Sequence, residues 1–124
     1  MTRFSFSIPA LTPSENKLIK GRTNRWDYRK LREDWHNWVK VGCQYIEIPE
    51  ALPYEKRRVD VVSYRVSLLD RDNLVGGMKP LFDGMVSGGL LFDDGPKYLE
   101  KGEIDQVRVP KRSLERTEVV LTIF

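Results

Sequence analysis

The chain has 124 residues, with 21 Lys and Arg against 18 Asp and Glu, which gives a formal net charge of +3. Hydrophobic residues make up 40% and charged residues 31%, a balance that excludes a disordered chain and fits a single domain over residues 1–124. No apolar run approaches the ~20 residues needed to cross a membrane. One cysteine and one histidine exclude an internal disulfide and a histidine-rich zinc site. We therefore expect a soluble, cytoplasmic protein whose metal ligands, where it has them, are largely carboxylates.

The positive charge is concentrated in one segment. Residues 17–32 contain seven cations and one acid, a net +6, which leaves −3 for the rest of the chain. Such a block attracts a nucleic-acid backbone, because each neutralised phosphate releases condensed counterions. A solvated helix face with its preceding loop explains the same composition. Both interpretations stay open at this point.

The first half of the chain predicts a strand, a loop and a helix. Residues 4–8 alternate apolar and polar side chains and predict a strand, and residues 9–16 are turn-rich and predict a loop. A helix is predicted over residues 26–46, with Asn24 as its N-cap. Its apolar stripe is expected to face the core rather than DNA bases. The stripe consists of Tyr28, Leu31, Trp35, Trp38 and Tyr45.

The second half predicts a strand, a helix and two further strands. The strand covers residues 59–69, the helix follows Asp72 and stops at residues 87–89, and the last strands cover residues 103–109 and 117–124. The order β-α-β-α-β-β is typical of an α+β domain, with two main helices packed on a small mixed sheet.

Acidic residues cluster around the predicted end of the strand over residues 59–69. If the strand geometry persists, Asp70 and Asp72 point to the same side, and two such carboxylates repel unless a cation such as Mg²⁺ lies between them. Lys79 lies two helical turns after Asp72 and reaches back toward the acids. Asp93 and Asp94 follow the helix. These residues predict a carboxylate cluster with a lysine beside it.

Each of these residues also has a purely structural explanation. Asp72 can cap the following helix, Lys79 can pair with Asp83 four residues later, and Asp93-Asp94 can form a turn. What these explanations leave open is the pair Gly76-Gly77, which weakens a helix by about 1 kcal/mol per residue. Either the helix begins near Met78, or the backbone approaches another part of the chain closely.

In chain order, these residues resemble the RusA family of Holliday junction resolvases. The resemblance covers nearly the whole chain and rests on Asp70-x-Asp72-Asn73-Leu74, the lysine on the following helix, Phe82-Asp83-Gly84 and Leu-Phe-Asp93-Asp94. Near the N-terminus, Ile8-Pro9 and Pro13-Ser14-x-Asn16 resemble the Pro-Ser-x-Asn signature of the family.

The resemblance implies a homodimeric, Mg²⁺-dependent endonuclease that nicks two opposed strands of a four-way DNA junction in recombination and repair, with Mn²⁺ as an alternative metal. It implies an essential role for Asp70, Asp72 and Asp94 as metal ligands and catalytic carboxylates, with Asp93 as a neighbouring ligand and Lys79 as the catalytic lysine. The protein would then act in the cytoplasm of a bacterium, encoded by the cell or by a phage. The expected DNA contacts are Asn16, Lys17, Lys20, Arg22, Arg25 and Arg71.

The chain departs from the best-known family pattern in two places. Residues 75–77 resemble a three-residue insertion that moves Lys79 away from Asp72, and Leu68-Leu69 replace a basic run, so that Arg71 is expected to substitute in part. Two other functions stay open. The first is a nuclease for flaps, forks or duplex DNA, and the second is a non-catalytic DNA-binding or assembly protein.

Overall fold

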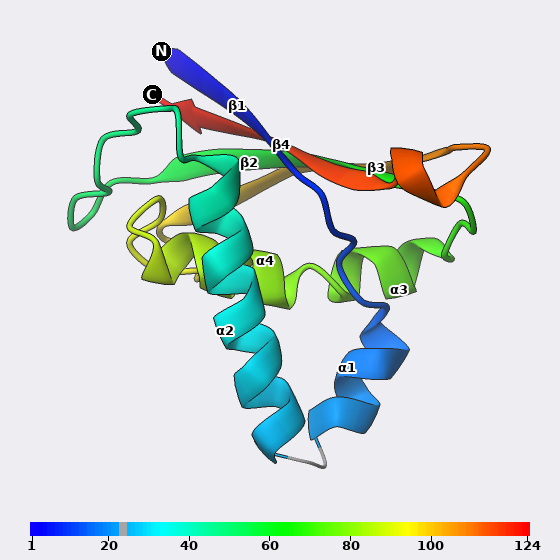
Figure 1. The fold of residues 1–124 in the computed structure, drawn as a ribbon. Coiled ribbons are helices and arrows are strands. Elements are labelled where there is room, and N and C mark those ends of the chain that lie inside the picture. The colour runs from blue at the N-terminus through cyan, green and yellow to red at the C-terminus, as the bar shows by residue number, and fades with distance from the viewer. Residues whose placement is uncertain (23–24) are drawn as a thin grey trace.

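A mixed sheet forms one layer of the protein in the computed structural model (Figure 1). The structure describes residues 1–22 and 25–124, with side chains for residues 1–18 and 28–124. The described strands lie in the order β1-β4-β2-β3, in which β4 is antiparallel to β1 and β2, and β3 is parallel to β2. Their bounds are β1 Thr2–Ile8, β2 Arg57–Arg65, β3 Leu99–Arg108 and β4 Arg116–Ile123.

The helices form a second layer, on one face of the sheet (Figure 1). Helix α1 contacts α2 and α3, and α2 packs on α4. The bounds are α1 Glu15–Arg22, α2 Arg25–Gly42, α3 Arg71–Gly76 and α4 Lys79–Ser87, with a short 3₁₀ helix, η1, at Arg112–Leu114. The predicted α+β class with a mixed sheet is therefore confirmed, although α1 was not predicted and the second predicted helix is divided into α3 and α4.

The hydrophobic core lies between the sheet and the helices α2 and α4. Alternate residues of β2 are buried, as are Val119 and Leu121 of β4, because successive side chains of a strand point to opposite faces. Burial of this apolar surface is the main force that holds the two layers together. The core includes Trp35, Val39, Val59, Val61, Leu81, Phe82, Met85, Val119 and Leu121.

A glycine brings α2 and α4 into close contact. A Cβ atom built on Gly84 would lie 2.7 Å from the carbonyl oxygen of Trp35, which leaves no room for a side chain. The backbone of α4 therefore lies directly against α2. The neighbouring residue Asp83 is thereby brought beside α2.

Two helix predictions for the first half of the chain need correction. Helix α1 lies in the basic segment, where no helix was predicted; the Ser14 hydroxyl accepts a hydrogen bond from the Lys17 amide at 3.2 Å, and Leu18 is buried. Helix α2 ends at Gly42, so Tyr45 lies beyond it and is 92% exposed instead of facing the core. The predicted cap, Asn24, lies outside the described residues. Packing of Leu31, Trp35 and Trp38 on the core is confirmed.

The strand before the acidic motif is shorter than predicted. Strand β2 ends at Arg65, five residues before Asp70. Asp70 is instead the N-cap of α3, and Asp72 lies in the first turn of that helix. The alternation of a strand therefore does not orient these two carboxylates, and Asp72 is not the capping residue.

The predicted second helix is broken into α3 and α4 between Gly76 and Lys79. The amide of Gly77 donates to the carbonyl oxygen of Asn73 at 3.1 Å, and a Cβ atom on Gly77 would clash with the carbonyl oxygen of Pro13. Both explanations of the glycine pair are confirmed: a new helix begins near Met78, and the backbone of Gly77 approaches the loop that precedes α1.

Candidate active site

Lys79 lies at the centre of a cluster of charged side chains. Its ammonium group donates to Asp94 Oδ2 at 2.6 Å and to Asp83 Oδ1 at 3.1 Å. Asp83 lies one turn along α4, whereas Asp94 comes from the loop between α4 and β3. The structure therefore joins Lys79 to the late acidic pair, and it also contains the Lys79–Asp83 pair expected from the helical spacing.

Asp83 connects this cluster to helix α2. The hydroxyl of Tyr28 donates to Asp83 Oδ2 at 3.0 Å, and Arg32 Nε lies 3.9 Å from the same oxygen. The side chain of Asp83 is only 15% exposed. Both of its oxygens therefore have partners, and α2 and α4 are joined next to Lys79.

These contacts change the proton affinities of the groups. The hydrogen bond from Lys79 lowers the pKa of Asp94 despite partial burial, and the hydrogen bond to Asp94 raises the pKa of Lys79. Burial and, after it, the charge and hydrogen bond of Asp83 raise the pKa of Tyr28. At neutral pH the cluster therefore holds a charged lysine, an ionised Asp94 and a neutral tyrosine.

A second group of polar contacts surrounds the start of α3. Asp70 accepts from the Asn73 amide at 3.0 Å and from the Asn73 side chain at 2.8 Å. The bond from the backbone, followed by the bond from the side chain, lowers the pKa of Asp70. The side-chain oxygen of Asn73 in turn accepts from the amide of Asn16 at 3.1 Å. The N-terminal Pro-Ser-x-Asn segment and the Asp-x-Asp-Asn segment are therefore in direct contact.

The predicted metal ligands do not gather at one point. Asp72 and Asp93 are exposed, and Asp93 Oδ1 accepts the backbone amide of Asp94 at 2.8 Å. Among the residues whose side chains the structure describes, no three Asp, Glu, His or Cys side chains form a group that could hold a metal ion. Carboxylate oxygens suit Mg²⁺, but in this arrangement the cation beside Asp94 is the Lys79 ammonium group.

The predicted DNA contacts are only partly described. Asn16 and Lys17 are exposed on α1. Arg71 is exposed but donates from Nη1 to the carbonyl oxygen of Ile104 at 3.1 Å, which ties it to β3. The side chains of Lys20, Arg22 and Arg25 lie outside the described part of the structure.

Two residues of the cluster were not among the predicted site residues. Asp83 was considered only as a structural partner of Lys79, and Tyr28 only as part of the core stripe. The spacing of four residues from Lys79 is a signal for Asp83. No local signal identifies Tyr28, because its contact joins positions 55 residues apart.

None of the described helices is long and apolar enough to cross a membrane. No protein-family model and no curated protein matches the chain. The resemblance to RusA resolvases therefore rests on the motif residues of the sequence.

Proposed function

We propose that the protein is a structure-specific endodeoxyribonuclease that resolves four-way DNA junctions as a homodimer, with Mg²⁺ as its cofactor. The observation that carries the proposal is contact between motif residues far apart in the sequence. Lys79 Nζ lies 2.6 Å from Asp94 Oδ2, and the amide of Asn16 lies 3.1 Å from Asn73 Oδ1. Contact between motif residues that lie apart in the sequence supports the proposal that they belong to one site.

Lys79 is the residue to which the cluster gives a clear chemical role. Its two carboxylate neighbours keep it protonated, and its side chain is 43% exposed, so the ammonium group is accessible to a ligand. A positive charge fixed before the substrate arrives stabilises charge that develops on a phosphate during hydrolysis. We therefore assign Lys79 to the scissile phosphate or to its leaving oxygen.

We include Mg²⁺ in the proposal because the motif is rich in carboxylates, which are ligands that Mg²⁺ prefers. A bound divalent ion would supply Lewis-acid chemistry and an activated water. Because no three-ligand group exists among the described side chains, the dependence on metal has to be measured directly. The basic segment over residues 17–32 would hold the junction through phosphates, which gives binding that depends on shape and salt.

The decisive experiment is cleavage of a labelled synthetic four-way junction with Mg²⁺, with Mn²⁺ and with a chelator. The variants are Asp70→Asn and Asp94→Asn, with Asp34→Asn as a control that neutralises an exposed carboxylate on α2. Asparagine is also a good N-cap, so Asp70→Asn removes the charge of Asp70 while α3 keeps its cap. We expect paired nicks from the wild type and the control only. Absence of nicks in the wild type, or full activity in Asp70→Asn, would falsify the proposal.

Junctions must also be compared with other DNA structures. Flaps, forks and linear duplex at the same salt concentration test whether the four-way junction is preferred. Equal cleavage of linear duplex would show that the protein is a less selective nuclease that uses the same site, and not a junction resolvase. Sedimentation equilibrium of the free protein tests the dimer, because a two-fold assembly places two sites on a two-fold junction.

One observation favours a second candidate, a non-catalytic DNA-binding protein. Asp70 caps α3, and Lys79 is bonded to two carboxylates, so both residues have structural roles without any reaction. In that case Asp70→Asn and Asp94→Asn bind the junction as tightly as the wild type, and no variant cuts DNA with either metal.

A further inference from the structure

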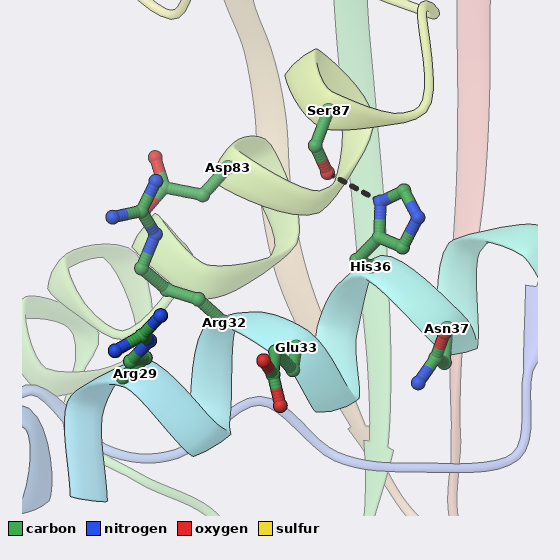
Figure 2. A pocket seen from close by; sticks show the side chains of 7 residues that line it. All are labelled: Arg29, Arg32, Glu33, His36, Asn37, Asp83 and Ser87. Atoms are coloured by element: carbon green, nitrogen blue, oxygen red, sulfur yellow. Dashed lines mark hydrogen bonds and ion pairs between the residues drawn. The ribbon is translucent and has the colours of Figure 1, made fainter. Parts of the chain in front are cut away.

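A hollow of about 480 Å³ lies between α2 and α4, beside the Lys79 cluster. Arg29, Arg32 and His36 of α2 line it, together with Asp83 and Ser87 of α4 (Figure 2). Asp83 belongs to both places, because it also accepts the hydrogen bond from Lys79. The hollow therefore opens next to the proposed catalytic lysine.

The arrangement of α2 explains why these donors line the hollow. Positions 29, 32 and 36 are three and four residues apart and share one face of the helix. The buried side chains of Trp35 and Val39 hold the adjoining face of the helix in the core. The guanidinium groups and the imidazole are consequently held on the side that faces the hollow.

Both carboxylate oxygens of Asp83, which lines the hollow, already have partners. Asp83 accepts Lys79 on Oδ1 and Tyr28 on Oδ2, and Arg32 Nε is 3.9 Å from Oδ2. Glu33 is the other acid that lines the hollow; it is exposed, and in Figure 2 its carboxylate points away from Asp83. Three basic side chains therefore line the hollow, and Glu33 is the lining carboxylate that does not contact the Lys79 cluster.

The imidazole of His36 is held in a defined orientation. Its Nδ1 lies 2.6 Å from the Ser87 hydroxyl, and that hydroxyl donates to the carbonyl oxygen of Gly84 at 3.2 Å. These contacts hold the ring against α4. The charged groups lining the same hollow are Arg29, Arg32, Glu33 and Asp83.

We infer that this hollow binds a phosphate group of the DNA backbone, with Arg32 and His36 as the principal side chains that bind it. A guanidinium group suits the planar, two-point recognition of phosphate oxygens, and the volume exceeds that of a single phosphate. That the phosphate comes from DNA rests on the proposed function. DNA bound along the basic segment would then pass the hollow before it reaches Lys79.

Inorganic phosphate tests the site without DNA. His36 is the only histidine of the chain, so its imidazole C–H resonances can be assigned without further variants in a proton NMR spectrum. At constant pH and ionic strength, we expect phosphate to shift these resonances saturably, and Arg32→Gln to weaken binding roughly threefold or more. Lys40→Gln, which removes a charge on α2 outside the hollow, should bind phosphate like the wild type. A shift that does not saturate, or that Arg32→Gln leaves unchanged, overturns the site.

Binding of the four-way junction then tests the source of the phosphate. We expect Arg32→Gln and His36→Gln to lose roughly three- to tenfold in affinity, with a salt dependence smaller by about one phosphate contact. Lys40→Gln should match the wild type. If the wild type binds and cuts the junction and both variants do so equally well, the inference is wrong and the proposed function stands. If phosphate binds at His36 but the wild type neither binds nor cuts DNA, the proposed function and the DNA source are overturned, whereas the phosphate site is supported.

Discussion

At the residue scale, Asp83 is the side chain on which the contacts around Lys79 depend. It accepts from Lys79 and Tyr28 and lies 3.9 Å from Arg32, while only 15% of its side chain is exposed. Asp83→Asn removes the charge and turns one acceptor oxygen into a donor that faces other donors. We expect the free energy of unfolding to fall by about 1–2 kcal/mol, measured by urea denaturation.

The proposed nuclease activity should respond to Asp83 separately from stability. With Asp83→Asn, Lys79 keeps only Asp94 as a charged partner, so we expect kcat for junction cleavage to fall more than the affinity for the junction. Asp34→Asn is the matched control, since Asp34 forms an exposed i,i+4 pair with Lys30 at 3.9 Å. Its effect on stability should stay within about 0.5 kcal/mol. Equal losses in the two variants would contradict a special role for Asp83.

The Lys79–Asp94 pair predicts how stability changes in acid. The hydrogen bond from Lys79 lowers the pKa of Asp94 in the folded protein, so the pair contributes stability above the unfolded-chain pKa of about 3.9. That contribution is lost as the pH falls through the folded-state pKa. Between about pH 5 and about pH 3 we expect the urea midpoint to fall less in Asp94→Asn than in the wild type. Parallel curves for the two proteins would show that the pair does not stabilise the fold.

Local spacing predicts contacts within one element better than contacts between elements. The Lys79–Asp83 pair follows from a separation of four residues on a helix. The contact of Asn16 with Asn73 joins positions 57 residues apart, so it depends on how α1 and α3 pack. Asp70 was placed at the end of a strand because the apolar run continues to Leu69, whereas pairing in the sheet ends at Arg65.

At the element scale, the junction between α3 and α4 depends on a residue without a side chain. Gly77 has φ −76°, which alanine also adopts. Glycine is therefore required here because there is no space for a side chain, not because of the backbone conformation. A Cβ atom there would clash with the carbonyl oxygen of Pro13 and push the loop before α1 away from α3. We expect Gly77→Ala to destabilise the protein by about 1–3 kcal/mol, measured by urea denaturation.

The control for this substitution is Gly95→Ala. A Cβ atom on Gly95 meets no atom within 4 Å, so its effect on stability should stay within about 0.5 kcal/mol. If both variants have the stability of the wild type, the close packing of Gly77 against Pro13 does not contribute to the fold.

Apolar periodicity in the sequence predicted the helices and strands that bury one face, but it did not predict α1, which is mostly polar. Strand β4 and helix α2 carry apolar residues toward the core, whereas the buried positions of β2 include Arg57, Ser63 and Arg65. Helix α1 is polar, and Leu18 is its buried apolar residue among the side chains described. Its start was nevertheless signalled by Ser14 followed by Glu15, a capping residue with an acid in the first turn.

At the scale of the whole molecule, the two sides of the sheet differ in the segments that carry their cations. The helices cover one face (Figure 1). On the other, Arg116 stacks 3.8 Å from the ring centre of Tyr64 and pairs with Glu118 at 3.0 Å, and Arg58 pairs with Asp60 at 3.1 Å. These cations of the open face are offset by neighbouring carboxylates, whereas the helical side carries the segment over residues 17–32 with a net charge of +6. We therefore expect a polyanion to bind on the helical side.

Comparison of one cation from each face tests which side binds DNA. Lys17 is exposed on α1, in the segment with a net charge of +6, whereas Arg116 lies on the open face of the sheet. We expect Lys17→Gln to weaken junction binding and to reduce the slope of log affinity against log salt by about 0.9, the value for one phosphate contact. Arg116→Gln removes the same charge and should leave both quantities unchanged, as fluorescence anisotropy over a salt series would show. The reverse result would move the DNA to the open face, and it would separate DNA binding from the Lys79 cluster altogether.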